Sequence, residues 1–419
     1  MTQSTYKSPS TFRAANRPAA GLHFKVPNPY FGSEYGDEEY EAVKQAMQQE
    51  WQTNGPQTGA FEEEFAAYVG SAYAFATTNC TAALHMGAEL MQLGPKDEVI
   101  TTPITFVATS QPAVARGAKV VFADVDPRTF NIDPESIAEL ITARTRAIFL
   151  VHDCGQPCDM DPIMDLARTH NLLVLEDAAR AVGATYKGRQ VGSFGDVGAF
   201  SFHSLKNMTT LGEGGMLTTS RPDYAEIMPM LRSMGVKYYF ELSEDEWPAE
   251  EAHRFAYEVF EPAGVVPRNN RMSEAQAAVG RVQLAKLDQL NARRRAAAHF
   301  LSEHLREIDE ITPPYEDPNC THVFHLYIAL FDGSRIGATA PDLRDVLTRE
   351  EGIQVGSLNM PNYLHRIYRI RGYEAGICPV AERVYDQSVA LPIHPRLTQE
   401  DLDTMVAAVK SAIYKLKHR

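Results

Sequence analysis

Residues 171–220 read NLLVLEDAARAVGATYKGRQVGSFGDVGAFSFHSLKNMTTLGEGGMLTTS. The stretch contains two apolar runs, Leu172–Leu175 and Val197–Phe202, whose lengths are typical of short buried strands. Three glycines then open a third expected strand at Met216. This order of strand, loop, strand, loop and strand indicates the buried sheet of an α/β protein.

Polar side chains stand where these apolar runs end. Glu176 and Asp177 follow the first run, and Ser201, His203 and Lys206 stand at the end of the second. Enzymes of the α/β class place their chemistry at such strand ends. A lysine beside hydroxyl groups that could hold a phosphate suggests a Schiff base. A carboxylate about thirty residues earlier suggests a partner for a pyridinium nitrogen.

The chain resembles the pyridoxal-phosphate (PLP) sugar aminotransferases of the DegT/DnrJ/EryC1/StrS family over about residues 28–400. The motifs that carry the resemblance are E-D-A-x-x-A at Glu176–Ala181, G-S-x-G-D-x-x-x-F-S-F at Gly192–Phe202, the lysine loop at Lys206, Asn207 and Gly212–Gly215, and N-x-R-M-[ST]-E at Asn269–Glu274. The Ser201-Phe202-His203 run followed by Lys206 is most similar to the branch that aminates UDP-linked 4-keto pentoses. In combination these motifs are specific.

The resemblance implies an α/β fold of the aspartate aminotransferase type (fold type I), with a mostly parallel central sheet in a large domain and a smaller C-terminal α+β domain. We expect a flexible N-terminal extension at 1–27, which is either disordered or packed on a partner subunit. The large PLP-binding domain is expected at 28–290, and a stem helix with the small domain at 291–419. Residues 237–266 are expected to be an insertion near the active-site mouth or a dimer surface, where it sets substrate choice.

The local patterns predict the individual elements along the chain. Helices are expected at 33–49 with Ser33 as its cap, 58–69, 82–91, 133–142, 161–170, 223–235, 274–305 with Ser273 as its cap, 339–351 and 398–416. Strands are expected at 72–77, 98–102, 119–125, 147–152, 323–331 and 353–358. The basic run Arg293–Arg295 is interpreted as a solvated helix face.

Two residues carry the chemistry that the resemblance implies. Lys206 forms the Schiff base with PLP and, once freed, acts as general acid and base. Asp177 stays ionised and keeps the pyridine nitrogen protonated, so that the ring draws electrons from the substrate. A free Lys206 amine needs a lowered pKa, which a cationic or apolar environment would give.

The resemblance also assigns the residues around the cofactor and the substrate. The start of the helix after Asn79 is an anion site for the phosphate, where Cys80 replaces the usual glycine of the family. Further contacts are assigned to Thr81 and Ser201 (phosphate), Phe106 (ring stacking), Asn269 (phosphate of the neighbouring subunit), and Tyr363 and His365 (substrate). His203 either orients the lysine loop or touches the phosphate.

Arg180 departs from the family, which commonly has glutamine or histidine at this position. An arginine here could bind the carboxylate of the amino donor as a bidentate fork, or it could point outward in an ion pair. We favour the fork. His152, in the loop His152-Asp153-Cys154-Gly155-Gln156-Pro157, is either a site residue or a structural histidine.

Composition excludes several classes of protein. The chain has 419 residues, with 40 Lys and Arg against 54 Asp and Glu, so its net charge of −14 argues against nonspecific nucleic-acid binding. No apolar run is long enough to span a membrane, and the N-terminus lacks the apolar core of a secretory signal. Five loosely spaced cysteines suggest free thiols in a reducing cytoplasm. We expect no metal, because His152, Cys154 and Cys158 do not have a usual zinc spacing.

The function expected from the resemblance is transfer of an amino group from L-glutamate (or L-glutamine) to a keto group of a nucleotide-linked sugar, in a homodimer with shared active sites. Amination of a ketocyclitol is the nearest alternative. A PLP-dependent sugar dehydratase would have histidine in place of Lys206. A regulatory protein on the same scaffold would usually lack the lysine or carry a DNA-binding domain.

Overall fold

The computed structural model describes residues 23–29, 31–238 and 257–419. Its centre is a seven-stranded sheet with the strand order β1-β9-β8-β5-β4-β2-β3. Four of the six strand pairings are parallel and two, on either side of β9, are antiparallel. The expectation of a mostly parallel sheet in an α/β fold is therefore confirmed.

The strands of this sheet are β1 (Tyr73–Thr77), β2 (Glu98–Thr101), β3 (Lys119–Phe122), β4 (Thr145–Val151), β5 (Leu173–Asp177), β8 (Val197–Ser201) and β9 (Gly215–Thr219). The helices of the large domain are α1 (Asp37–Met47), α2 (Pro56–Val69), α3 (Cys80–Leu90), α4 (Gln111–Ala115), α5 (Pro134–Leu140), α6 (Met160–His170) and α7 (Pro222–Arg232). Short 3-10 turns lie at η2 (Val107–Thr109), η3 (Asp153–Gly155) and η5 (Pro262–Gly264).

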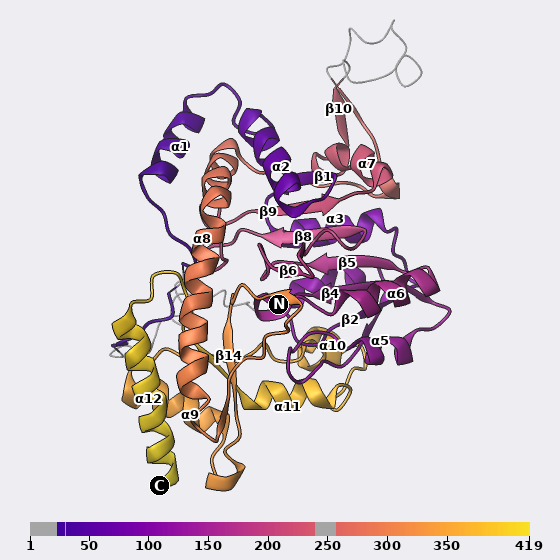
Figure 1. Cartoon of the computed structure of the whole chain (residues 1–419). Helices are drawn as coiled ribbons and strands as arrows, with labels where there is room; N and C mark the ends of the chain where they lie inside the picture. Colours follow the sequence, from indigo (N-terminus) through magenta and orange to yellow (C-terminus); the bar gives the residue numbers. More distant parts are fainter. Residues whose placement is uncertain (1–22, 30, 239–256) are drawn as a thin grey trace, which may run out of the picture.

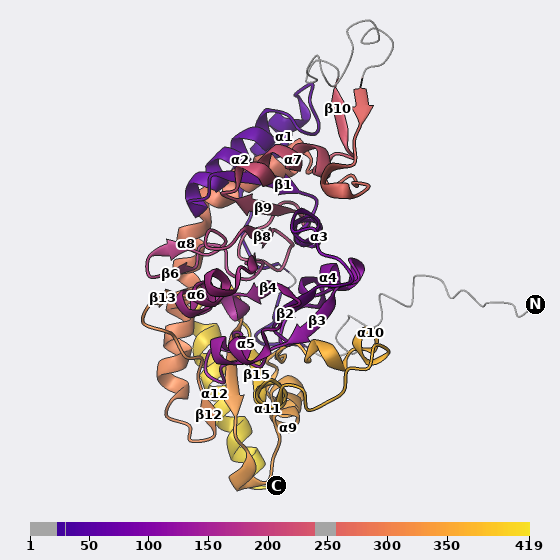
Figure 2. The same ribbon diagram turned by 90° about the vertical axis from the view of Figure 1, so that its right-hand side faces the viewer.

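Helices cover both faces of the sheet (Figure 2). Alternate residues of each strand enter different cores, because successive side chains of a strand point to opposite faces. Phe149 and Leu175 pack in the core on the α3 and α4 side, whereas Leu150 and Val174 pack in the core on the α6 side. Burial on both faces explains why these strands are continuously apolar in the sequence.

The long helix α8 (Glu274–Leu305) begins and ends where the sequence predicts it, with Ser273 as its N-cap. Figure 1 shows it running past the large domain, where it lies beside α1 and α2, and on to the small domain, where it lies beside α12. It thus joins the two domains as a stem.

The small domain contains the antiparallel sheet β12-β14-β15 with the helices packed on it. Its elements are β12 (Ile311–Thr312), η6 (Ser334–Ile336), β14 (Tyr327–Phe331), α9 (Ala340–Val346), a π-helical turn η7 (Leu347–Glu351), η8 (Asn362–Leu364), α10 (Arg366–Arg369), α11 (Pro379–Gln387), β15 (Ser388–Leu391) and α12 (Gln399–Lys417). A further small sheet joins β6 (Thr185–Tyr186) and β7 (Arg189–Gln190) to β13 (Cys320–Thr321).

Three predicted elements differ most from the structure. The first helix begins at Asp37 with Gly36 as its N-cap, because Ser33 instead donates a hydrogen bond from its hydroxyl to Gln283 Oε1 (2.6 Å). The strand expected at 323–331 begins only at Tyr327, since the preceding residues bond to the η3 turn. The strand expected at 353–358 is wrong: Ile353 and Gly356 each form only an isolated bridge, with Val26 and Ala390.

The prediction of a solvated face at Arg293–Arg295 is wrong for Arg294, which is fully buried. Its guanidinium donates to the backbone carbonyls of Phe324 (3.2 Å), Ile393 (3.0 Å) and Gly32. Burial, with Arg396 nearby, lowers the pKa of Arg294 to about 9. Of the three arginines, Arg294 thus points into the protein, and its hydrogen bonds link the stem helix to the segments that contain Gly32, Phe324 and Ile393.

The structure describes parts of the expected N-terminal extension (1–27) and of the expected insertion (237–266). Residues 1–22, most of the expected N-terminal extension, lie outside the described residues. Val26, however, is buried in the core of the small domain, and Lys25 N donates to Gly352 O (2.8 Å), so these residues pack on the protein instead of forming a flexible arm. In the expected insertion, β10 (Val236–Tyr238) pairs with β11 (Tyr257–Val259), and residues 239–256 lie outside the described part of the chain.

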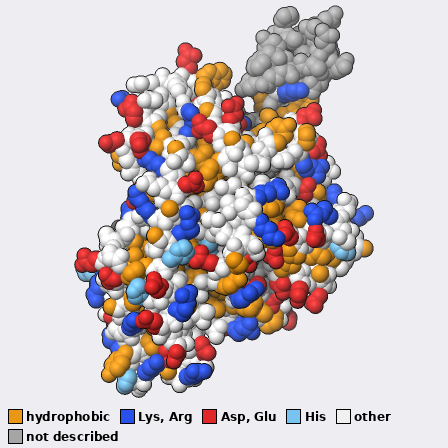
Figure 3. All heavy atoms as spheres, viewed as in Figure 1, with side chains coloured by type: hydrophobic (Ala, Val, Ile, Leu, Met, Phe, Trp, Pro, Cys, Tyr) orange, Lys and Arg blue, Asp and Glu red, His pale blue; other side chains and the backbone are white. Residues whose placement is uncertain are grey.

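The visible surface of the large and small domains mixes acidic and basic side chains on one face, without a broad basic area (Figure 3). None of the helices in the described ranges has the length and apolarity needed to cross a bilayer.

Two glycines of the packed helices α8 and α2 give a matched test of the core. A Cβ on Gly280 of α8 would lie 2.6 Å from the ring of the buried Phe61, whereas a Cβ on Gly59 of α2 would meet nothing within 4 Å. We expect Gly59→Ala to stabilise the protein by about 0.5–1 kcal/mol through helix propensity. Gly280→Ala gains the same helix propensity, but its new methyl group would overlap the Phe61 ring. We therefore expect it to destabilise the protein by about 1–3 kcal/mol. Urea denaturation measures both, and equal effects of the two variants would contradict the packing described here.

Candidate active site

The carboxylate of Asp177 lies at the C-terminal end of β5 and is 4% exposed. Thr109 Oγ1 donates to its Oδ2 (2.7 Å), and Ala179 N donates to its Oδ1 (3.0 Å). Thr109 belongs to the turn η2, which leads from β2 into α4, so a residue distant in sequence orients this acid. Thr109 was not identified from the sequence. Asp177 is therefore a fixed hydrogen-bond acceptor.

Lys206 lies in the loop between β8 and β9 and is half-buried. Its backbone N–H donates to His203 O (2.8 Å), and the loop is closed by bonds from Phe202 N to Gly214 O (2.9 Å) and from Ser204 N to Gly212 O (3.0 Å). Burial lowers the pKa of the Lys206 ammonium to about 8, and the Arg180 cation adds to the shift. Asp177 opposes it without reversing it.

Arg180 is buried and its Nη1 donates to Asp153 Oδ1 (2.5 Å). The ion pair that the sequence analysis considered therefore exists, but it lies inside the protein and does not point outward. Burial disfavours the charged form, but Asp153, Cys154 and Asp177 together outweigh that cost and keep the pKa of Arg180 above its usual value. Asp153, at the start of the η3 turn after β4, is a site residue that the sequence analysis did not assign.

A candidate anion site lies at the start of α3. The Asn79 side chain caps the helix by accepting from Ala82 N (2.9 Å), and Thr81 stands in the first turn. A Cβ on Gly215 would lie 2.5 Å from Asn79 C and 2.6 Å from Cys80 N, so β9 can approach this helix start only through a glycine. Free backbone N–H groups at a helix start attract anions. Burial raises the pKa of the Cys80 thiol well above its usual value, so it remains protonated.

Ser201 and His203 follow β8 on the way to Lys206. Ser201 is buried at the strand end, and its Oγ accepts weakly from His203 N (3.4 Å). The ring Nδ1 of His203 accepts from Leu205 N (3.3 Å). This bond links His203 to the loop just before Lys206, and the two roles expected for His203 stay predictions.

Two predicted cofactor contacts lie on the surface of the described chain. Phe106 precedes η2 and is 63% exposed, although a phenylalanine side chain is ordinarily buried. Asn269 is exposed on a segment that pairs with the end of β1 through Thr78 N, which donates to Asn270 O (2.9 Å). Both residues are placed so that a neighbouring molecule or ligand could reach them.

The structure corrects the prediction of Tyr363 as a substrate contact. Its side chain is fully buried against Phe122, and its hydroxyl donates to Glu382 Oε1 (2.6 Å). This side chain therefore holds the segment before α10 against the large domain. His365 is half-buried at the N-cap of α10 and keeps an accessible surface.

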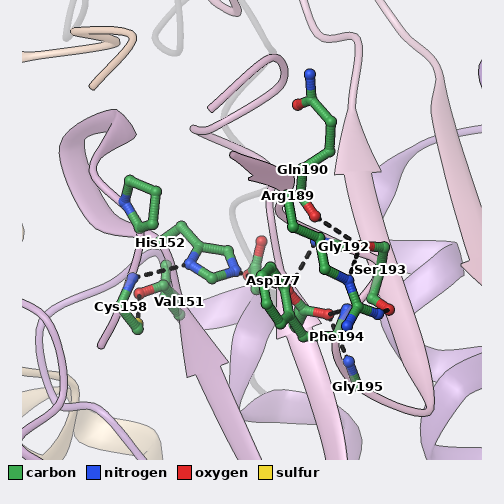
Figure 4. Close-up of polar contacts among 12 residues, drawn as sticks. Val151, His152, Cys158, Asp177, Arg189, Gln190, Gly192, Ser193, Phe194 and Gly195 are labelled. Carbon is green, nitrogen blue, oxygen red and sulfur yellow. Dashed lines mark hydrogen bonds and ion pairs between the residues drawn. The ribbon is translucent and has the colours of Figure 1, made fainter. Parts of the chain in front are cut away.

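The other acid of β5, Glu176, has a structural role. Its carboxylate accepts from the backbone N–H groups of Gly192 (2.7 Å), Phe194 (2.7 Å) and Gly195 (2.6 Å). Cys158 N donates to His152 Nδ1 (3.0 Å), so His152 Nε2 carries the ring hydrogen and donates to Glu176 (3.0 Å) (Figure 4). His152 is thus a structural histidine, one of the two roles left open for it. Within the described ranges, His, Cys, Asp and Glu side chains form no group of three that could hold a metal.

His325 is a third residue, after Thr109 and Asp153, that was not identified from the sequence. It is buried near Lys206 and Arg180, and burial lowers the pKa of its ring well below the usual value, so the ring is neutral. Its Nδ1 lies 3.3 Å from Asn207 Oδ1. The sequence places Asn207 directly after Lys206, so Asn207 can be assigned to the lysine loop. It does not show that His325, far along the chain, contacts Asn207.

The segment 31–33 lies against the lysine loop. Gly32 N donates to Ser204 O (2.7 Å), and its carbonyl accepts from Arg294. Arg396 of the small domain donates to Phe31 O (2.7 Å) and to Ser33 O. Contacts from three distant parts of the chain therefore fix the backbone around Lys206.

Comparison with known proteins gives a consistent result. The sequence model of the DegT/DnrJ/EryC1/StrS aminotransferase family matches residues 33–410. The chain is 37% identical to the spore coat polysaccharide biosynthesis protein SpsC of Bacillus subtilis, over 92% of this chain and 97% of that protein. It is 37% identical to the GDP-perosamine synthase of Caulobacter vibrioides, over 84% and 89% of the two chains. A crystal structure of an aminotransferase from Psychrobacter cryohalolentis superimposes with a TM-score of 0.85 at 33% identity, covering 94% of this chain and all of that one.

Gly32 gives a test of how the lysine loop is held. A Cβ at this position would lie 2.4 Å from Leu205 O and 2.6 Å from Lys206 O, and these backbone atoms cannot move aside without displacing the lysine. We expect Gly32→Ala to weaken PLP binding about tenfold or more, since small displacements of reacting groups are costly. Spectroscopic titration with PLP measures the effect.

The matched control is Gly36→Ala, whose Cβ would meet only side-chain atoms at 3.9 Å. It should bind PLP as the unmodified protein does. Equal affinities of the two variants would show that the segment 31–33 does not position the loop.

Proposed function

Since the chain belongs to the DegT/DnrJ/EryC1/StrS aminotransferase family, we propose that it transfers an amino group from L-glutamate (or L-glutamine) to a keto group of a nucleotide-linked sugar. The observation that carries this proposal is the presence in one site of a half-buried lysine of lowered pKa, Lys206, and a buried and oriented carboxylate, Asp177. The family consists of PLP-dependent transaminases, and this chain retains both groups that such an enzyme needs.

The residues present fit PLP. Asp177 is held ready to accept a hydrogen bond from a ring nitrogen, and the start of α3 with Thr81 and Ser201 provides donors for a phosphate. Phe106 offers an exposed ring face for stacking. When bound, PLP supplies an aldehyde that condenses with amines and a ring that accepts electrons.

Lys206 is the proposed catalytic residue. Its Nζ would accept the proton that leaves the α-carbon of the amino donor and would later release a proton to complete the transfer. An amine can do this at neutral pH only if an appreciable fraction is unprotonated, and the pKa of about 8 provides that fraction. Asp177 would hold a proton on the ring nitrogen.

The acceptor class is inferred from the relatives. One relative is a GDP-perosamine synthase and another acts in spore coat polysaccharide biosynthesis, so we assign this chain a nucleotide-linked keto sugar and an amino sugar product. A ketocyclitol is the alternative acceptor. Because the described thiols are unpaired and four of the five are buried, we place the protein in the reducing cytoplasm.

We further propose a homodimer in which Asn269 reaches the phosphate site of the partner. Asn269 is exposed, and apolar side chains beside the lysine, Leu205 and Leu211, are also exposed at 42% and 46%. Such apolar exposure around a polar site is typical of a surface that another subunit covers.

Borohydride reduction in the presence of PLP tests the central assignment. We expect the label on the peptide containing Lys206, and we expect Lys206→Ala to lower the rate of amino transfer about 10³-fold or more. Lys187→Ala is the control, because Lys187 is an exposed lysine paired with Asp161 and should not affect the rate. A label on any other lysine would overturn the proposal.

Mixing two inactive variants tests the shared site. If Asn269 serves the partner's site, a hybrid of Lys206→Ala and Asn269→Ala subunits contains one complete site and regains activity. If Asn269 serves its own subunit, no complete site forms and the mixture stays inactive. Activity is measured after co-refolding or co-expression, and a mixture as inactive as its parents contradicts the shared arrangement.

A screen of acceptors decides between the two substrate classes. The aminated form of the enzyme is mixed with keto-sugar nucleotides and with ketocyclitols, and return of the aldehyde absorbance is followed. We expect return with a keto-sugar nucleotide. Return with ketocyclitols alone would establish the alternative.

A further inference from the structure

The Asp153–Arg180 ion pair is a feature of this chain that the transamination chemistry itself does not require. Arg180 occupies a position that the sequence analysis identifies as a departure from the family. Both side chains are buried, and Asp153 is 1% exposed. An ion pair removed from water loses solvation energy, so its presence at this place calls for a compensating role.

Asp153 is held rigidly by the chain around it. Its backbone N–H donates to Asn131 Oδ1 (2.8 Å), and Asn131 Nδ2 donates in turn to Gln156 O (2.9 Å) and Pro157 O (2.9 Å). The loop therefore cannot carry the carboxylate away from Arg180 without breaking a buried network. Since Nη1 of Arg180 is engaged by Asp153, a substrate carboxylate could bind this guanidinium only through its remaining N–H groups.

The charges near Lys206 are balanced. The loop of Asp153 lies beside the lysine loop, because Leu326 N donates to Cys154 O (3.2 Å) and His325 Nδ1 lies 3.3 Å from Asn207 Oδ1, in the residue after Lys206. Two cations, Lys206 and Arg180, and two carboxylates, Asp177 and Asp153, are thus gathered in a largely buried region. In such surroundings a charge is felt more strongly than in water. The other titratable groups that face Lys206 are the Cys80 thiol of α3 and the ring of His325, and His325 in turn faces Arg294 and His203.

From this arrangement we propose that the Asp153–Arg180 pair is a positioning pair that holds a fixed positive charge beside Lys206 and keeps its amine ready to accept a proton. The proposal rests on the proposed function, in which Lys206 is the proton acceptor. It assigns Arg180 an electrostatic role through Lys206 in place of the carboxylate fork that the sequence favoured.

The sign of each contribution makes the proposal testable. Arg180 disfavours the ammonium form of Lys206, whereas Asp153 favours it. Removing the cation with Arg180→Gln should therefore raise the pH at which Lys206 loses its proton, by about 1 pH unit. Removing the anion with Asp153→Asn should lower it. The double variant removes both charges and should lie between the single variants, and Arg180→Lys, which keeps the charge, should resemble the unmodified protein.

The measurement is reductive methylation of the full-length protein with formaldehyde and borohydride, after removal of PLP, across pH 6.5–10. Only the unprotonated amine reacts, so mass spectrometry of the Lys206 peptide against pH gives its midpoint. Lys187 is the internal reference in each sample, because neither Lys187 nor its partner Asp161 is changed in any of the variants. A role limited to folding would move both single variants in the same direction.

The outcomes separate this proposal from the proposed function. Shifts of opposite sign support the pair, and unmoved midpoints or shifts of one sign overturn it. Should Arg180→Gln fail to fold, the comparison of Asp153→Asn with the double variant carries the same sign test. Failure of PLP and borohydride to label Lys206 in the unmodified protein would refute the proposed function independently of these shifts. A raised KM for L-glutamate in Arg180→Gln, with an unmoved midpoint, would restore the carboxylate fork.

Discussion

The alternation of side chains at the end of β5 is the constraint on which the rest of the site depends. Glu176 and Asp177 are neighbours in sequence, and they point to opposite faces of the sheet because successive residues of a strand do so. Glu176 gathers three backbone N–H groups of the 192–195 loop and the ring of His152, and this fixes the loop that leads into β8. Asp177 points to the α3 side, where Thr109 orients it. One acid therefore builds the strand end, and the other serves the site.

The lysine loop depends on contacts that come from outside the large domain. Asn207 Nδ2 donates to Val323 O (3.0 Å) and to Asn291 Oδ1 (2.8 Å) on the stem helix. The amide oxygen of Asn207 is then left to accept from His325, so the ring of His325 carries its hydrogen on Nδ1. Arg294, one turn further along α8, binds Gly32 O on the other side of the loop. The stem helix thus fixes both flanks of Lys206 and couples the site to the small domain.

The fold class and the positions of Lys206 and Asp177 could be predicted from the sequence, because both follow from local patterns of residues. Apolar runs gave the strands of the main sheet, and short motifs placed Lys206 and Asp177 at strand ends, where the structure has them. Thr109, Asp153 and His325 could not be found in this way, since each reaches the site only through tertiary contacts. Tyr363 was misassigned because its place in the chain does not reveal that Glu382 and Phe122 bury it. Helical periodicity alone likewise could not show that Arg294 is the buried member of a basic run.

The buried charges explain why the arginine at position 180 is accompanied by a carboxylate at position 153. An arginine at position 180 without a carboxylate would leave an uncompensated charge beside Lys206, which is strongly destabilising in a buried region. Asp153 supplies that carboxylate from the loop after β4, the strand next to β5 in the sheet. Because β4 and β5 are parallel, the loops after them leave the sheet at the same edge, and residues 24 and more positions apart can pair there. The sheet therefore does more than position Lys206 and Asp177: it also brings together Asp153 and Arg180 from two loops that are separate in the sequence.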